Sequence, residues 1–122
     1  MARVLIADDA SFMRQMIREI IEPEGYEVVG EATNGIEAVE QFEELSPDVV
    51  TMDIVMPKRS GIDAVKSILA SHPDAQVVMC SALGQETLVM EALQAGAKDF
   101  IVKPFKPDIV LETLARVLDK EI

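Results

Sequence analysis

Short apolar runs alternate with amphipathic stretches along the whole chain. Five runs have the length and apolar character of strands, and they cover residues 3–7, 26–31, 49–53, 76–80 and 99–102. Each run is followed by residues whose apolar side chains recur every three to four positions, which is typical of a helix packed on one side. Gly and Pro residues separate these segments, so we expect helices to begin near Ser11, Asn34-Gly35, Gly61, Gln85 and Pro107. Ser11 is expected to cap the first of them.

Strict alternation of strands and helices predicts an α/β fold. Parallel strands joined by right-handed crossovers place helices on both faces of one sheet, a doubly wound arrangement. The third run, Val49 to Asp53, is almost continuously apolar, as expected for a strand buried on both faces, whereas residues 26–31 are more polar and suit an edge. A chain of 122 residues fits one domain, spanning residues 1–122.

Polar side chains follow four of the predicted strands. Parallel strands end at one edge of the sheet, so residues that are distant in sequence become neighbours there. The residues in question are Asp8 and Asp9 after the first strand, Asp53 after the third, Ser81 after the fourth, and Lys103 with Pro104 after the fifth. Three converging carboxylates repel one another unless a cation enters or they bind protons. The sequence therefore predicts a Mg²⁺ site, with Mn²⁺ as an alternative ion.

A bound divalent ion would let a phosphoryl donor approach Asp53, whose carboxylate can act as the nucleophile. Lys103 and the Ser81 hydroxyl then supply donors for the phosphoryl oxygens. Each residue also has an ordinary structural interpretation: an Asp can end a strand or cap a helix, a Ser can form a turn, and a Lys can be solvated. The combination at one sheet edge favours the functional interpretation.

Charge and cysteine content restrict the partners and the compartment. The net charge is −11, and no Lys or Arg lies between Arg18 and Lys58, which argues against binding to nucleic acid or to an anionic membrane. Cys80 is the only cysteine, so no disulfide can form within the chain. With no signal-peptide core and no apolar run of membrane-spanning length, we expect a cytoplasmic, monomeric protein. Cys80 is expected to be a core thiol and His72 a solvated loop residue without a charged partner.

These motifs resemble those of two-component response-regulator receiver domains. The likeness covers the whole chain and is carried by Asp8-Asp9, by Asp53 with Met56-Pro57 and Gly61, by Ser81-Ala82, and by Lys103-Pro104-Phe105. Within that family the chain is most similar to single-domain chemotaxis regulators. The resemblance implies the flavodoxin-like strand order 2-1-3-4-5 with five helices, and a signalling function rather than an enzymatic one, with slow autodephosphorylation at most.

The resemblance also implies a role for each site residue. Asp53 would accept a phosphoryl group from a histidine kinase. Asp9 and Asp53 would bind Mg²⁺ directly, Asp8 through water, and Val55 through its backbone carbonyl. Ser81 and Lys103 would contact the phosphoryl group, Phe100 would turn inward as the switch aromatic, and the Lys103–Pro104 bond would be cis. Val55 and Leu83 are apolar where many relatives have polar side chains, so the lifetime of the phosphorylated state is left open.

The helix after Gln85 is apolar nearly all round, which suggests a partner surface on its outer face. That surface would include Met90, Phe100, Pro104 and the last helix. Because the last helix, which begins at Pro107, runs to the end of the sequence at Ile122, we expect the output to be a binding event rather than the activity of an attached domain. The expected partners are a chemotaxis-type histidine kinase, a flagellar motor switch protein or an archaeal adaptor, and a dedicated phosphatase.

The sequence also allows three other functions to be considered. A receiver in a non-chemotaxis phosphorelay would have the same site. A small Mg²⁺-dependent phosphohydrolase also uses an aspartyl-phosphate, but its usual second Asp, two residues after the nucleophile, is Val55 here, so the general acid is missing. A flavodoxin-like cofactor binder is disfavoured because no Gly-rich or Ser/Thr-rich loop follows the first strand, where Asp8 and Asp9 would repel a phosphate.

Overall fold

A single parallel sheet forms the centre of the molecule in a computed structural model that describes residues 1–119. Its strands are β1 (Arg3–Ala7), β2 (Glu27–Ala32), β3 (Val49–Asp53), β4 (Val77–Ser81) and β5 (Asp99–Val102). Every neighbouring pair is parallel, and the order across the sheet is β2-β1-β3-β4-β5. The predicted doubly wound, flavodoxin-like fold is therefore confirmed.

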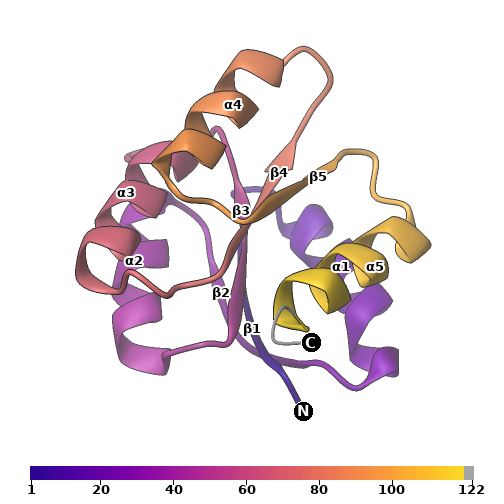
Figure 1. The fold of residues 1–122 in the computed structure, drawn as a ribbon. Coiled ribbons are helices and arrows are strands. Elements are labelled where there is room, and N and C mark those ends of the chain that lie inside the picture. Colours follow the sequence, from indigo (N-terminus) through magenta and orange to yellow (C-terminus); the bar gives the residue numbers. More distant parts are fainter. Residues whose placement is uncertain (120–122) are drawn as a thin grey trace.

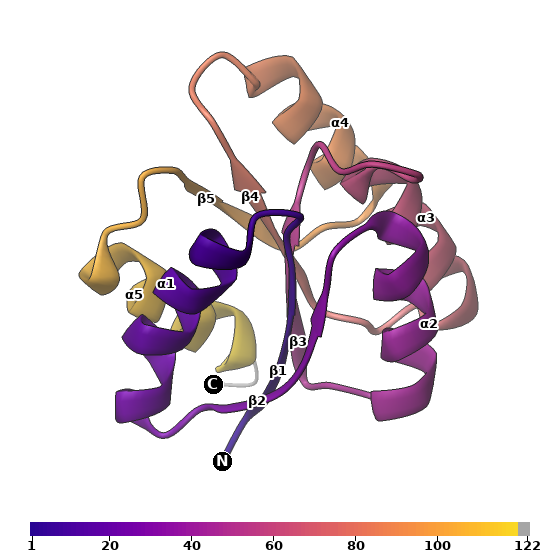
Figure 2. The ribbon, with the colours of Figure 1, turned by 180° about the vertical axis from the view of Figure 1, so that it is seen from behind.

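Helices cover both faces of this sheet. They are α1 (Ser11–Ile21), α2 (Gly35–Leu45), α3 (Gly61–Ser71), α4 (Glu86–Ala95) and α5 (Pro107–Leu118), with a short 3₁₀ turn, η1 (Glu22–Glu24), after α1. Helices α1 and α5 lie together on one face, and α2, α3 and α4 lie on the other (Figures 1 and 2). The predicted end of the last helix at Ile122 lies outside the described residues.

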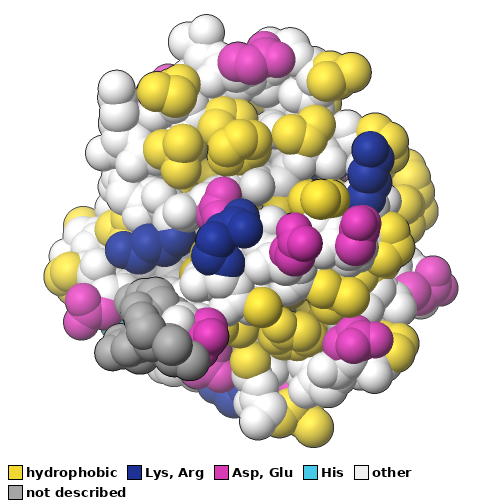
Figure 3. All heavy atoms as spheres, turned by 45° about the vertical axis from the view of Figure 1, so that its right-hand side comes forward, with side chains coloured by type: hydrophobic (Ala, Val, Ile, Leu, Met, Phe, Trp, Pro, Cys, Tyr) yellow, Lys and Arg dark blue, Asp and Glu magenta, His cyan; other side chains and the backbone are white. Residues whose placement is uncertain are grey.

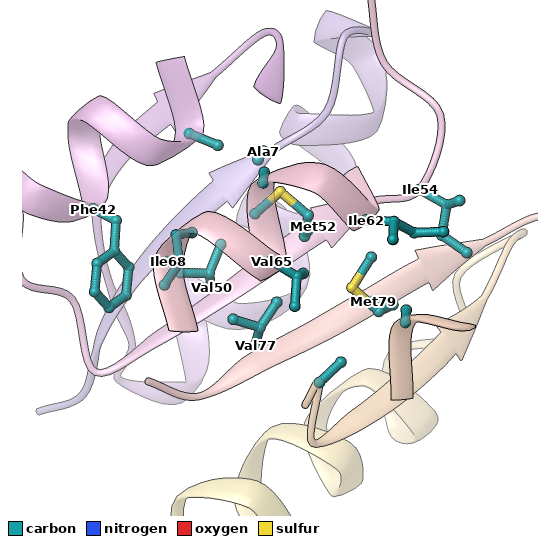
Figure 4. Packing of buried hydrophobic residues seen from close by; sticks show 14 of the residues in the cluster. Ala7, Phe42, Val50, Met52, Ile54, Ile62, Val65, Ile68, Val77 and Met79 are labelled. Atoms are coloured by element: carbon teal, nitrogen blue, oxygen red, sulfur yellow. The ribbon is translucent and has the colours of Figure 1, made fainter. Parts of the chain in front are cut away.

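Two hydrophobic clusters, one on each face of the sheet, hold these layers together. On one face Val50 and Met52 of β3 pack against α3, which contributes Val65 and Ile68 (Figure 4). The other cluster joins β1, β4 and β5 to α1 and α5. Strand β3 is buried along its whole length because it has a helix layer on each side, which explains its apolar sequence. Full burial of each large aliphatic side chain contributes about 1.5–3 kcal/mol.

Cys80 lies in the cluster formed with α1 and α5 and is only 1% exposed. Burial raises the pKa of its thiol, with a further contribution from the neighbouring Asp53 carboxylate. The prediction that Cys80 is a core thiol is confirmed.

The ends of the helices agree with the sequence except at α1. Asn34 caps α2 by accepting a hydrogen bond from the Glu37 amide, and Pro107 occupies the first turn of α5. Ser11, predicted to cap α1, is instead the first helical residue, and Ala10 holds the cap position without a side-chain bond. That prediction was wrong because the Ala10 carbonyl accepts from the Met13 and Arg14 amides, which a Ser11 cap would have bonded.

His72 also departs from expectation. It lies in the turn after α3, and its Nε2 is 2.8 Å from Glu43 Oε2 of α2. Its ring is tilted against Phe42, with 5.2 Å between the ring centroids. His72 therefore has an acidic partner that its local sequence does not reveal, because Glu43 is 29 residues away.

Within residues 1–119, none of the helices combines the length and hydrophobicity that crossing a lipid bilayer requires.

Candidate functional site

Three carboxylates meet at the carboxyl edge of the sheet. Asp8 and Asp9 follow β1, and Asp53 is the last residue of β3, the strand beside it. One oxygen from each of the three side chains lies within 4.8 Å of the others. Asp8 and Asp53 are buried, whereas Asp9 is exposed. We call these three residues the acidic cluster.

Lys103 contacts the acidic cluster, and Ser81 lies beside it at the neighbouring strand end. Lys103 Nζ is 3.0 Å from Asp8 Oδ2 and 3.3 Å from Asp53 Oδ1. The Lys103 amide donates to the Ser81 carbonyl at 2.7 Å, which ties the residue after β5 to the last residue of β4. The Lys103–Pro104 bond is cis, as the resemblance implied. The structure therefore brings together the predicted residues from β1, β3, β4 and β5.

The charges in this site are unbalanced. Within residues 1–119, Lys103 is the one cation that pairs with the acidic cluster, and it pairs with two of its members, Asp8 and Asp53. Burial raises the pKa of Asp53 to about 6, and the negative charge of Asp8 adds to the increase, while Lys103 opposes it. Burial alone would lower the pKa of Lys103, but its carboxylate neighbours outweigh that effect and raise it. Ionised Asp53 is thus costly in the absence of a further cation.

One buried oxygen in the site has few polar partners. In the described part of the chain, the polar contact of Asp8 Oδ2 is its ion pair with Lys103 Nζ at 3.0 Å. A buried carboxylate oxygen of this kind, beside two more carboxylates, suits a hard divalent cation. The acidic cluster could therefore hold a metal ion.

The loop after β3 fixes the backbone at Asp53. The Gly61 amide donates to the Ile54 carbonyl at 2.8 Å, and the Ile54 amide donates to the Cys80 carbonyl at 3.2 Å. A Cβ atom on Gly61 would overlap the main-chain carbonyl oxygen of Asp53, so only Gly allows the loop to approach this closely. Val55 follows directly, and its side chain is 56% exposed.

Comparison with known proteins decides the family. The response regulator receiver domain family model matches residues 4–115. The chain is 61% identical to chemotaxis protein CheY of Thermotoga maritima, over 94% of this chain and 96% of that protein. It is 56% identical to chemotaxis protein CheY of Bacillus subtilis, over 96% and 98% of the two chains. This chain belongs to the response regulator receiver family.

Solved structures agree with this assignment. In the crystal structure of a CheX–CheY–BeF₃–Mg²⁺ complex from Borrelia burgdorferi, a chain matches this receiver with a TM-score of 0.91 and 40% identity. The match covers 95% of this chain and 88% of that one. Receivers are phosphoacceptor signalling proteins, and this chain is one of them. The alternatives, a receiver in a non-chemotaxis phosphorelay and a small phosphohydrolase, are not favoured.

The predicted partner surface of the receiver is exposed and apolar. Met90 of α4 is 56% exposed and Phe100 of β5 is 40% exposed, and both line one hollow beside β4 and β5. Phe100 also lines an adjoining hollow with Pro104 and Ile109. Figure 3 shows hydrophobic side chains gathered across the upper part of this face, at the level of α4. The Phe100 ring is thus partly exposed in this structure, and its inward turn stays a prediction.

Two residues near the receiver site were missed from the sequence. Arg14 donates from Nη1 to the Asp8 carbonyl at 2.7 Å, and Gln85 Oε1 accepts from the Ala82 amide at 2.7 Å. Gln85 lies four residues beyond the end of β4 and is not one of the residue types that commonly mark turns. Arg14 gave no signal either, because Glu31, its second partner, is on another element.

Proposed function

We propose that Asp53 accepts a phosphoryl group from a histidine kinase and that the phosphorylated receiver signals to a chemotaxis apparatus. The observation that carries this proposal is the position of Asp53. It is buried at the end of β3, beside two further carboxylates and 3.3 Å from Lys103. That environment combines a nucleophilic oxygen with a place for a cation and a donor for a phosphoryl oxygen.

In the proposed reaction an Asp53 carboxylate oxygen forms a bond to phosphorus. The bond from phosphorus to the kinase histidine nitrogen breaks at the same time, and its electron pair stays on the imidazole. Residues that would hold Mg²⁺, or Mn²⁺ in its place, are Asp9 and Asp53 directly, Asp8 through water, and the Val55 backbone carbonyl. The ion would supply positive charge next to the phosphoryl oxygens.

Lys103 and Ser81 respond to the new group in this proposal. The Lys103 ammonium, which pairs with Asp53 Oδ1, would shift its contact to a phosphoryl oxygen. The Ser81 hydroxyl would donate to another. Because the Lys103 amide is bonded to the Ser81 carbonyl, movement at one strand end is transmitted to the other and to Phe100 on β5. Phe100 would then turn inward and change the surface lined by Met90 and Pro104.

The output is proposed to be binding at that surface. The relatives named above are chemotaxis proteins, and the Borrelia protein was crystallised with CheX, which supports signalling partners of this kind. We propose a chemotaxis-type histidine kinase as donor and a flagellar motor switch protein or an archaeal adaptor as receptor, with a dedicated phosphatase. The receiver would act as a cytoplasmic monomer, bind neither nucleic acid nor membrane, and hydrolyse its own phosphate only slowly.

Phosphorylation at Asp53 can be tested with acetyl phosphate and Mg²⁺. We expect one phosphoryl group per chain by intact mass spectrometry, located at Asp53 after borohydride reduction and peptide mapping. Asp53→Ala should abolish the labelling, and chelation of Mg²⁺ should do so in the wild type. Asp74→Asn, which changes an exposed acid in the turn after α3, is the matched control and should label normally. Full labelling of Asp53→Ala would overturn the proposal.

The partner surface can be tested with the beryllofluoride-bound receiver. Met90→Glu should weaken binding to a flagellar switch protein or adaptor by more than tenfold, because a charge would be buried in an apolar contact. Ile36→Glu on α2 is the matched control, since Ile36 is 43% exposed and α3 separates α2 from α4. Equal affinity of Met90→Glu and wild type would rule out this surface.

A further inference from the structure

We propose that Arg14 is a positioning residue for the acidic cluster. It lies on α1, outside the cluster, and connects the edge strand β2 to the segment between β1 and α1 that carries Asp8 and Asp9. The inference rests on the proposed metal site. It adds a residue to which no role was given from the sequence.

Arg14 makes two short contacts in different directions. Its Nη1 donates to the main-chain carbonyl of Asp8 at 2.7 Å, and its Nε donates to Glu31 Oε1 at 2.7 Å. Only 14% of the side chain is exposed, so the guanidinium is held within the protein. A planar group with several fixed donors can bridge two acceptors in this way, whereas an ammonium group is a single point of contact.

The Asp8 end of this bridge is held by two further hydrogen bonds. The Asp8 amide donates to the Ala32 carbonyl at 3.0 Å, and Asp8 Oδ1 accepts from the Ala10 amide at 2.9 Å. With the carbonyl bonded to Arg14, the remaining acceptor is Oδ2, which pairs with Lys103 Nζ at 3.0 Å. The hydrogen bonds around Asp8 thus direct one carboxylate oxygen into the acidic cluster, and Arg14 is the side chain that holds the Asp8 carbonyl.

Arg18 provides a comparison within the same structure. It binds Glu31 through Nη2 at 2.6 Å and Glu22 through Nη1 at 2.6 Å. It therefore shares the Glu31 partner with Arg14, and it lies one helical turn further along α1. Its recorded bonds go to these two glutamates and not to Asp8. Substitution of Arg18 should disturb the same ion-pair network without releasing the Asp8 backbone.

Positioning and simple electrostatics predict opposite results. Removing a positive charge near three carboxylates would strengthen cation binding if only long-range attraction and repulsion mattered. Loss of the bridge would weaken cation binding, because Asp8 would no longer be held in place before the ion arrives. Arg14→Lys keeps the charge and loses the two-way bridge, so it isolates the positioning effect.

The test is a titration of Mg²⁺, and of Mn²⁺ by electron paramagnetic resonance, into wild type, Arg14→Lys, Arg14→Gln, Arg18→Lys and Arg18→Gln. We expect both Arg14 variants to bind about tenfold more weakly, as is typical when a group supporting a metal ligand is lost. Both Arg18 variants should stay within about twofold of wild type, because the Arg18 bonds go to Glu22 and Glu31 and its ion pairs are partly exposed. Thermal unfolding of Arg14→Lys and Arg18→Lys measures the structural cost of each change separately.

A second measurement uses the metal-free protein. Hydrogen exchange at the Ala10 amide, which donates to Asp8 Oδ1, should become several-fold faster in Arg14→Lys and stay unchanged in Arg18→Lys. If Arg14→Lys does not fold, Glu31→Gln weakens the same bridge from its other end and should lower Mg²⁺ affinity about threefold.

Wild-type Mg²⁺ affinity in Arg14→Lys would overturn the inference and leave the proposed function intact. Equal weakening in Arg14→Lys and Arg18→Lys would also overturn it, because the effect would then follow general loss of structure. Absence of Mg²⁺ binding in the wild type would instead overturn the proposed metal site, which is a distinguishable result.

Discussion

Two groups of charged side chains involve the elements next to strand β1, and they differ in charge balance and exposure. The ion-pair network of Arg14, Arg18, Glu22 and Glu31 contains two positive and two negative side chains and is partly exposed. The acidic cluster of Asp8, Asp9 and Asp53 has Lys103 as its one paired cation, and two of its three acids are buried.

The difference shows which group is neutralised by its own side chains and which has room for a further cation. Each carboxylate of the balanced network has a guanidinium partner, so the pKa of Glu31 is lowered, chiefly by its hydrogen bond to Arg18. In the acidic cluster the pKa of Asp53 moves the other way, chiefly through burial. The repulsion in the acidic cluster is largest when no cation is bound, so binding a cation and a phosphoryl group lowers its free energy most. The balanced network has no such unmet requirement.

The largest expected effect comes from the backbone that supports the acidic cluster. Gly61→Ala should lower the free energy of unfolding by about 3 kcal/mol, because the new methyl group overlaps the Asp53 carbonyl and the loop must move. Gly25→Ala is the control: Gly25 has a φ of 93° but open space around it, so only backbone strain of about 1 kcal/mol is expected. Urea unfolding measures both. Equal losses would show that loop packing at Asp53 has no special importance.

Neutralising the acidic cluster should stabilise the metal-free protein. Since the pKa of Asp53 is raised to about 6 from 3.8, its ionised form is disfavoured in the folded state at neutral pH. Asp53→Asn should therefore raise the free energy of unfolding by about 2 kcal/mol at pH 8 in the presence of a chelator.

The stabilisation by Asp53→Asn should depend on pH. The stability associated with protonated Asp53 is present below pH 3.8 and is lost as the pH rises through about 6, so the advantage of Asp53→Asn should shrink as the pH falls across that window. Urea unfolding at several pH values checks it. Adding Mg²⁺ should stabilise the wild type and leave the variant nearly unchanged. If Asp53→Asn is less stable than the wild type at pH 8, the acidic cluster does not carry the unfavourable excess of negative charge described above.

Removing the one paired cation should have a smaller effect of the opposite sign. Lys103→Gln leaves Asp8 and Asp53 facing each other without neutralisation, and we expect a loss of about 1 kcal/mol at pH 8 without divalent ions. In an Asp53→Asn background the loss should be smaller, because one of the two carboxylates is already neutral. A double-mutant cycle by urea unfolding measures this coupling, and a coupling of zero would mean that the pair does not interact.

The smallest effect is expected in the balanced network. Glu31→Gln should cost about 0.5 kcal/mol at neutral pH, because the ion pairs are partly solvated and screened. The lowered pKa of Glu31 means that its contribution is present above pH 4.5 and is lost as the pH falls through the folded-state pKa. Unfolding curves at low and high salt should show a smaller difference at high salt. A larger cost than that of Lys103→Gln would reverse the comparison.

The acidic cluster could be predicted from the sequence because every member follows an apolar run. Asp53 and Lys103 are 50 residues apart, yet the rule that parallel strands end at one edge brings them together, and their atoms are 3.3 Å apart. The fold followed from the same alternation, including the polar edge strand β2. Both results depend on local patterns within single strands and helices.

The balanced network could not be predicted in this way. Arg14 meets Glu31 because the pairing of β1 with β2 shifts between Val4 and Leu5, which sets Glu31 opposite Ile6. An irregular register of this kind has no signature in the composition of either strand. The Ser11 cap failed because the Ala10 carbonyl accepts from the Met13 and Arg14 amides that the Ser11 side chain would have bonded. The pairing of His72 with Glu43 likewise depends on how α2 and α3 pack.

The burial of Cys80 has a practical consequence for following the switch in solution. A thiol that is 1% exposed and has a raised pKa reacts slowly with maleimides. The chain has no other cysteine and no tryptophan. A fluorescent dye attached to a cysteine introduced on α4, or a tryptophan placed on the same helix, would therefore give a single-site optical signal without prior removal of a native residue.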